Sequence, residues 1–249
     1  MRQKYERLSE EIKENLAQLT LEGESLNALS RITGLAKTTI YYHVKNLKPR
    51  QWRKMEIKIS DFEIGELVGA FAGDGTFYHR KYIPGVNLST SYKIRYCLSL
   101  ISDGEYCNYI AELLKKLNLN PMKIISKKSN TIYLTVNSKE FINFIKDYLT
   151  WEENKTLSIR LKESLENYSD NFLKGFARGL MDTDGYTNDN GNVACAGISK
   201  SLINNLEEIF NKFQIKTSNS SVKREKNRKE MFYVMVLKDG IRNYDSFIG

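Results

Sequence analysis

The sequence contains few of the residues that build disulfide frameworks and zinc sites. Its 249 residues include three cysteines (Cys97, Cys107 and Cys195), which form no CxxC pair, and two histidines, His43 and His79. An odd number of widely spaced cysteines is typical of a reducing environment. Two histidines alone argue against a histidine-based zinc site.

Long apolar segments are also missing. No stretch approaches the roughly 18 consecutive apolar residues of a membrane span. The first residues, MRQKYERLSEEIKENL, lack the apolar segment of a signal peptide. We therefore expect a cytoplasmic protein with no membrane partner. The apolar content of 41% and the charged content of 27% are ordinary for a globular chain that buries its own core.

Acidic residues are outnumbered by basic ones. The chain has 38 lysines and arginines against 30 aspartates and glutamates, a net charge of +8. Such a surplus favours an anionic partner such as nucleic acid. Net charge alone cannot separate a nucleic-acid-binding protein from a basic protein that binds nothing charged.

Residues 1–55 are predicted to form a small helical domain. An apolar stripe at Leu8, Ile12, Leu16 and Leu19 predicts a first helix. Two shorter helices follow on either side of Gly34, the first marked by Leu26, Leu29 and Ile32 and the second buried through Ile40, Val44 and Leu47. Helix, glycine turn and helix is the helix-turn-helix pattern, and the segment resembles the helix-turn-helix domains of prokaryotic regulators.

The polar face of the last of these helices is the predicted DNA-contacting surface of this domain. Its side chains can donate hydrogen bonds to phosphates and to base edges in a major groove. These residues are Lys37, Thr39, Tyr42, His43 and Lys45. The alternative is an ordinary pair of helices with a solvated polar face.

The rest of the chain is an internal repeat. DFEIGELVGAFAGDGTF (61–77) and DNFLKGFARGLMDTDGYT (170–187) are both apolar helical stretches that end in Asp-Gly. The segments downstream also match, so each copy is predicted as helix, two strands, helix, two strands, helix. The copies span residues 56–150 and 170–249, and residues 151–169 connect them.

Small residues recur every four positions in the two repeated helices. Residues four apart share one helix face, and each glycine inside a helix costs about 1 kcal/mol relative to alanine. Close approach of two helices offsets this cost, so these faces are predicted to pack together as an internal pseudo-dimer. The helix-packing residues are Gly65, Gly69, Gly73, Gly175, Gly179 and Thr183.

The two helices are predicted to end at a pair of facing carboxylates, Asp74 and Asp184. Each anion opposes its helix dipole at the C-terminal end, and two close like charges disfavour ionisation of both. A divalent cation removes both penalties, and carboxylate, water and phosphate oxygens suit Mg²⁺, with Mn²⁺ as an alternative. Acids with metal ions beside a phosphodiester are the parts of metal-assisted hydrolysis. For a single motif, the alternative is that Asp-Gly is a common turn signal.

LVGAFAGDG (67–75) and ARGLMDTDG (177–185) resemble the two motifs of the LAGLIDADG homing endonuclease family in its single-chain form. The resemblance covers about residues 57–249. It implies an α+β fold in which two tandem αββαββα repeats form a saddle of antiparallel sheets over double-stranded DNA. It also implies that Asp74 and Asp184 bind the catalytic metal. Ala72 departs from the earlier acidic position of the motif, which Asp182 keeps, but the family does not depend on that position for metal binding.

The resemblance further implies a basic residue near the active site after the last strand of each repeat. Lys139 and Lys238 fit by position and could stabilise charge on the phosphate or help to polarise the attacking water. The alternative for each is a solvated surface lysine.

Further DNA contacts are expected from the sheets and their loops. KIRYCLSL (93–100) alternates polar with apolar residues, so one face can pack while the other meets DNA. Several phosphate contacts together would make binding steeply salt-dependent. The expected contacts are His79, Arg80, Lys81, Lys93, Arg95, Lys127, Lys128, Lys223, Arg224, Lys226, Arg228 and Lys229.

The leading interpretation is a monomeric, metal-dependent homing endonuclease that cuts both strands of a long DNA site. The chain begins at Met1 and has no splice-junction His-Asn at its end, which favours an intron-encoded or free-standing enzyme over an intein. One alternative is a regulator with a LAGLIDADG-like domain that binds DNA without cutting it. Such proteins would be expected to lose the acids, which this chain keeps. Another alternative is an RNA maturase that binds intron RNA.

Overall fold

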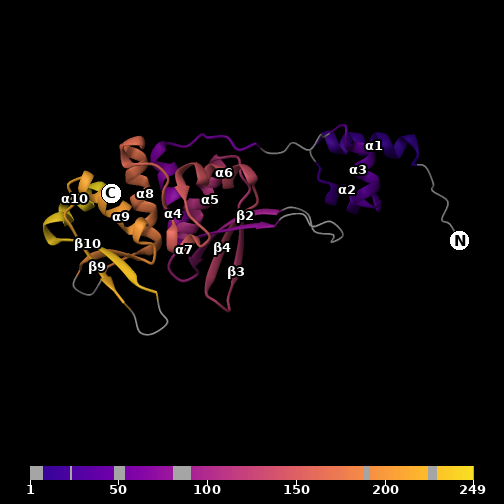
Figure 1. Cartoon of the computed structure of the whole chain (residues 1–249). Helices are drawn as coiled ribbons and strands as arrows, with labels where there is room; N and C mark the ends of the chain where they lie inside the picture. Colours follow the sequence, from indigo (N-terminus) through magenta and orange to yellow (C-terminus); the bar gives the residue numbers. More distant parts are fainter. Residues whose placement is uncertain are drawn as a thin grey trace. The chain divides into compact units, whose positions relative to one another are not determined.

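The structure is a computed structural model, and it describes residues 8–22, 24–47, 54–80, 91–187, 191–223 and 229–248. The chain divides into two compact units, Met1–Arg53 and Lys54–Gly249. Figure 1 follows the chain through both units. Each unit is described by itself.

The smaller unit is built from three helices, α1 (Glu10–Leu21), α2 (Leu26–Thr33) and α3 (Lys37–Val44). Its core consists of Leu16, Leu29, Ile40 and Val44. Gly34 ends α2 in the left-handed region at φ 70°, which glycine adopts without a Cβ clash. Leu47, expected in the buried face, lies beyond the end of α3 and is 40% exposed.

The larger unit consists of two repeats with the same order of elements, which confirms the predicted α+β fold. The first repeat contains α4 (Asp61–Asp74), β1 (Gly75–Arg80), β2 (Ser91–Ser99), α5 (Gly104–Lys116), β3 (Met122–Ser126), β4 (Thr131–Val136) and α6 (Lys139–Tyr148). The second contains α8 (Asp170–Asp184), β7 (Gly185–Thr187), β8 (Val193–Gly197), α9 (Lys200–Lys212), β9 (Thr217–Val222), β10 (Met231–Val236), η2 (Lys238–Gly240) and α10 (Ile241–Ile248).

The two antiparallel sheets have equivalent strand orders, β1-β2-β4-β3 and β7-β8-β10-β9. In Figure 1 the motif helices α4 and α8 lie in the middle of this unit, with strands of the two sheets extending below them on either side. On β2, Ile94, Tyr96 and Leu98 are buried, while Lys93 and Arg95 point to the other face, as the alternation in the sequence predicts. Each sheet therefore has one packed face and one open face.

The segment between the repeats has its own local structure. It contains β5 (Leu149–Thr150), α7 (Lys155–Ser158), β6 (Arg160–Leu161) and η1 (Leu165–Asn167), and β5 pairs with β6. The connection is therefore a folded element and not an extended tether.

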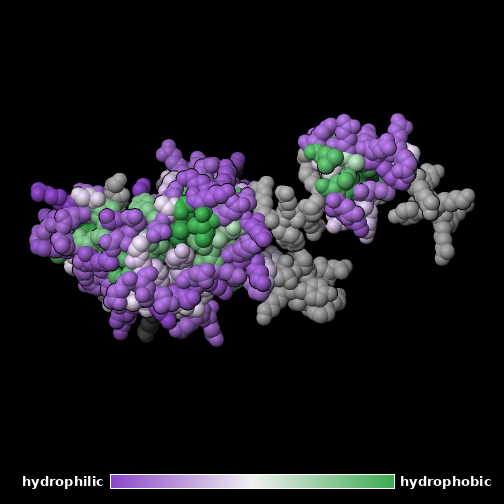
Figure 2. All heavy atoms as spheres, turned by 90° about the horizontal axis from the view of Figure 1, so that it is seen from above, coloured by the Kyte–Doolittle hydropathy of each residue, from purple (hydrophilic) through white to green (hydrophobic). Residues whose placement is uncertain are grey.

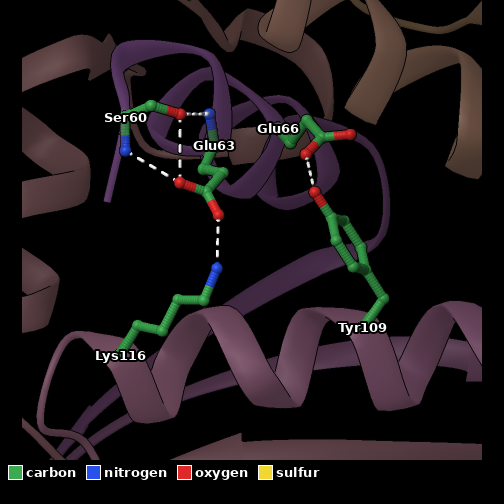
Figure 3. A network of polar contacts seen from close by, with 5 residues as sticks. All are labelled: Ser60, Glu63, Glu66, Tyr109 and Lys116. Carbon is green, nitrogen blue, oxygen red and sulfur yellow. Dashed lines mark hydrogen bonds and ion pairs between the residues drawn. The ribbon is translucent and has the colours of Figure 1, made fainter. Parts of the chain in front are cut away.

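Serine caps begin both motif helices. Ser60 and Glu63 form a capping box in which the Glu63 amide donates to Ser60 Oγ and the Ser60 amide donates to Glu63 Oε2. Lys116 of α5 pairs with Glu63 Oε1 at 2.6 Å, as Figure 3 shows. Ser169 caps α8, and its hydroxyl also donates to Asp61 of α4, which ties the two helix starts together.

On the face that Figure 2 draws, the surface of each unit is largely hydrophilic, with smaller hydrophobic patches between the polar side chains. In the part of the chain that the structure describes, no helix is long and apolar enough to cross a membrane.

Candidate acidic centre between the motif helices

The glycine faces of α4 and α8 lie directly against each other. A Cβ at Gly65 would lie 2.2 Å from the carbonyl oxygen of Phe172, and one at Gly69 would lie 2.2 Å from that of Phe176. From the other side, a Cβ at Gly179 would lie 2.3 Å from the carbonyl oxygen of Glu66. Any side chain at these positions would push the backbones apart.

This packing brings the ends of the helices together at Asp74 and Asp184, the last residue of each helix. A Cβ at Gly73 would lie 2.2 Å from Thr183 Oγ1 and 3.1 Å from Asp184 Oδ2, so the Asp184 carboxylate lies against the last turn of α4. Gly75 then carries the chain into β1, and a Cβ there would lie 2.3 Å from the carbonyl oxygen of Phe71.

Both carboxyl groups are desolvated. Burial, together with the charges of Asp184 and Asp103, raises the pKa of Asp74 to about 7, while the charge of Lys155 opposes the rise. Burial also raises the pKa of Asp184, again against the charge of Lys155. The centre therefore holds two acids that ionise reluctantly unless cations neutralise them.

Lys155, the first residue of α7, supplies a cation that the sequence did not single out. Its Nζ donates hydrogen bonds to the carbonyl oxygens of Ala72 at 2.9 Å and Gly73 at 3.3 Å, in the last turn of α4. The same atom lies 4.9 Å from the centre of the Phe71 ring. Burial lowers the pKa of Lys155 to about 8, with the charges of Asp184 and Asp74 opposing that shift. No periodicity in WEENKTLS distinguishes this lysine from its charged neighbours.

The two lysines named from the sequence lie in other surroundings. Lys139 begins α6, and its ammonium is 5.9 Å from the centre of the Tyr92 ring on β2. Lys238 begins η2 and is exposed. Within the described residues, the lysine whose charge acts on the pKa of both aspartates is Lys155.

The donor set at the centre suits a hard divalent cation. Asp74 and Asp184 offer carboxylate oxygens, and burial raises the pKa of both groups even though the charge of Lys155 lies close to them. Among the described residues, no group of three His, Cys, Asp or Glu side chains forms a metal cage. Water and a phosphate would therefore complete the coordination shell, as is common for Mg²⁺.

A second polar cluster crosses the helix pair two turns before the acids. Glu66 of α4 is fully buried, and its Oε1 lies 3.2 Å from Arg178 Nε on α8. Tyr109 of α5 donates its hydroxyl to the other oxygen, as Figure 3 shows. Burial raises the pKa of Glu66, against the opposing effects of Tyr109 and Arg178. Asp182, the earlier acid of the second motif, lies 3.9 Å from Arg178 Nε.

The expected DNA-contacting residues that the structure describes lie on surfaces. On α3, Lys37, Tyr42 and His43 are exposed and Thr39 is half-buried, and Lys45, directly after the helix, is also exposed. On the first sheet, His79 stacks on Tyr92 and the Arg95 guanidinium lies 4.8 Å from the centre of the Tyr133 ring. The turn lysines Lys127 and Lys128 and the hairpin lysines Lys223 and Lys229 are exposed. Lys81, Arg224, Lys226, Arg228 and the side chain of Arg80 lie outside the described part of the chain.

Comparison with known proteins agrees with this geometry. Residues 171–249 match the family model of the LAGLIDADG-like domain. A structure of variants of the homing endonuclease I-DmoI aligns with a TM-score of 0.58 and 15% identity, over 76% of this chain and 96% of that one. The larger unit has the LAGLIDADG fold.

Two further LAGLIDADG-fold structures and one curated relative complete the comparison. I-DmoI in complex with DNA and Mn aligns with a TM-score of 0.56 and 16% identity, over 76% of this chain and 97% of that one. The N-terminal LAGLIDADG domain of WhiA aligns with a TM-score of 0.50 and 15% identity, over 100% of this chain and 94% of that one. An uncharacterised protein of Methanocaldococcus jannaschii is 24% identical over 87% of this chain and 77% of its own length.

Proposed function

We propose that the protein is a divalent-metal-dependent endonuclease that hydrolyses both strands of a double-stranded DNA site. The observation that carries this proposal is the pair of desolvated carboxyl groups, Asp74 and Asp184, at the adjoining ends of α4 and α8. Half-buried acids with raised pKa values that adjoin each other are a signature of functional sites. The LAGLIDADG-fold neighbour I-DmoI, solved with DNA and Mn and with DNA and Ca, supports the same ligand classes here.

In this proposal the chain's own groups hold the metal and balance the charge. Asp74 and Asp184 would hold the divalent ion, which would supply Lewis-acid polarisation of the phosphate and acidification of water. The half-buried Lys155 ammonium, whose charge acts on both acids, limits their mutual repulsion and adds positive charge where the phosphodiester would bind. One chain contributes both aspartates, so we propose that it acts as a monomer with an internal pseudo-dimer.

The open faces of the two sheets are the proposed DNA-binding surface, and they differ in charge. The strand register makes Arg95 of β2, opposite Thr76, equivalent to Ala194 of β8, opposite Tyr186. Arg95 is stacked on Tyr133, which restricts the guanidinium before DNA arrives. The first sheet therefore offers a pre-ordered cation to a base edge or phosphate at a position where the second has the buried side chain of Ala194.

A protein that binds DNA without cutting it is the second candidate. The observation that favours it is the position of Lys155, whose ammonium already offsets part of the acidic charge without a metal ion. Arginines and lysines on the sheet faces serve either function equally well.

Cleavage of a plasmid library that carries candidate target sites, with Mg²⁺ and with EDTA, tests the proposal. We expect metal-dependent double-strand cleavage by the unmodified protein, and loss of at least about a hundredfold in rate in Asp74→Asn and Asp184→Asn. Asp147→Asn, which changes an exposed acid on α6, is the matched control and should cut normally. Binding without cleavage in any divalent metal would favour the second candidate, and cleavage by both active-centre variants would overturn the site.

A further inference from the structure

The structure of the connection holds Lys155 in place. The Ser199 hydroxyl donates to the Ile159 carbonyl oxygen at 2.7 Å, and the Leu161 amide donates to Asn205 Oδ1 at 2.9 Å. Together with the pairing of β5 with β6, these bonds fix the connection against the second repeat. Lys155 nevertheless reaches α4 of the first repeat. It is a positioned side chain and not a freely moving surface lysine.

The contacts of Lys155 are one-sided. The carbonyl groups in the last turn of a helix lack intrahelical donors and carry the negative end of the dipole, so an ammonium group binds well there. Among the described residues, the hydrogen bonds of Lys155 go to Ala72 and Gly73 of α4. At the equivalent turn of α8, the ammonium acts through its charge, which lowers the pKa of Asp184.

The charges at the centre do not cancel. When both carboxylates are ionised, as metal binding requires, they and one ammonium leave a net charge of −1, in addition to the negative ends of two helix dipoles. A divalent ion would be attracted by the carboxylates and repelled by the ammonium. The same lysine that limits repulsion between the acids without metal therefore opposes the entry of the metal.

We propose that Lys155 is a resident cation of the acidic centre, which holds the helix ends together when no metal is bound and weakens the binding of a divalent ion to Asp74 and Asp184. This inference rests on the metal site of the proposed function. Lys155 acts through the aspartates and is therefore a positioning residue for the site.

The proposal and a purely structural role of Lys155 predict opposite changes in metal affinity when the lysine is removed. A lysine that only supports the helix ends would, when removed, loosen the site and weaken metal binding. A resident cation would, when removed, strengthen metal binding, because the repulsion between two cations in a partly buried site disappears. We expect Lys155→Gln, which keeps hydrogen-bond donors but loses the charge, to bind Mn²⁺ at least about tenfold more tightly than the unmodified protein.

Titration calorimetry of the full chain with Mn²⁺, in the absence of DNA and at one neutral pH, tests this expectation. Lys155→Arg keeps the charge, and its Kd should stay within about threefold of the unmodified value. Lys162→Gln removes an exposed lysine from the same connection and is the matched control. Lys155→Met, whose side chain can pack on Phe71, is a second charge-removing variant in case Lys155→Gln does not fold.

Tighter Mn²⁺ binding in the charge-removing variants, with unchanged binding in Lys155→Arg and Lys162→Gln, supports the proposal. Unchanged or weaker binding in Lys155→Gln and Lys155→Met overturns it while leaving the metal site intact. If neither the unmodified protein nor any variant binds Mn²⁺, or if Asp74→Asn with Asp184→Asn binds it equally well, the proposed metal site fails together with the inference.

Discussion

Gly175 of α8 lies against the carbonyl oxygen of Phe62 of α4 so closely that a Cβ at Gly175 would be 1.9 Å from that oxygen. The clash would be with backbone, which cannot rotate away as a side chain can. The helices would have to separate, and the acidic centre at their ends would open with them.

We expect Gly175→Ala to lower the free energy of unfolding by about 3 kcal/mol or more, measured by urea denaturation. Gly104→Ala is the control, because Gly104 is also helical but nothing lies within 4 Å of a Cβ there. Alanine at that position should be neutral or stabilising by up to about 1 kcal/mol. Equal effects of the two substitutions would contradict the close packing of the motif helices.

The raised pKa of Asp74 predicts how stability depends on pH without metal. Because the folded-state pKa of about 7 lies above the ordinary value of 3.8, the folded state keeps a proton that the unfolded state loses. The corresponding contribution to stability is complete below about pH 4 and is lost as the pH rises through about 7.

We therefore expect Asp74→Asn to gain stability relative to the unmodified protein as the pH rises from 4 to 7 in EDTA, with urea denaturation as the measurement. Asp147→Asn, which changes an exposed acid on α6, is the comparison variant. Saturating Mn²⁺ should reverse the trend for the unmodified protein, since metal binding requires the deprotonated carboxylate. A difference between Asp74→Asn and the unmodified protein that does not change with pH would contradict the desolvated state of Asp74.

The ion pair of the buried Glu66 and the partly exposed Arg178 predicts strong coupling between α4 and α8. Arg178→Met removes the cation beside the fully buried Glu66 carboxylate, whose hydrogen bond from Tyr109 remains. We expect it to cost about 2–3 kcal/mol, less than for a fully buried pair because Arg178 is partly exposed. Combining it with Glu66→Gln should recover at least about 1 kcal/mol in a double-mutant cycle. Additive costs would show that the two side chains act independently.

Arg95 predicts how DNA affinity responds to salt. If the first sheet binds DNA, Arg95→Ala should weaken binding and reduce the slope of log K against log salt by about 1, measured by fluorescence anisotropy. Lys115→Ala changes an exposed lysine of α5 that pairs with Glu112 on its own helix, and it is the matched control. An unchanged affinity and slope in Arg95→Ala would place DNA binding elsewhere.

The repeat structure could be predicted because it depends on local patterns. Apolar residues every three or four positions indicate a helix wherever it lies in the fold. The alternation of polar and apolar residues from Lys93 to Leu100 likewise indicates a strand with one polar and one apolar face. The serine caps at Ser60 and Ser169 act within one turn and are equally local. The end of α3 at Val44 was not predicted, because helix ends depend on weak competing signals. Leu47 lies beyond that end and is exposed.

By itself the sequence determined the two glycine-faced helices and the aspartate at the end of each, since residue spacing sets which side chains share a helix face. Only the tertiary structure decided which cation joins those aspartates. Lys155 reaches α4 because β5 pairs with β6 and because Asn205 and Ser199 of the second repeat hold the connection. These contacts join residues far apart in the chain, and no periodicity in the sequence reports them. Lys139 and Lys238, chosen by position along the chain, lie instead beside Tyr92 and at an exposed turn.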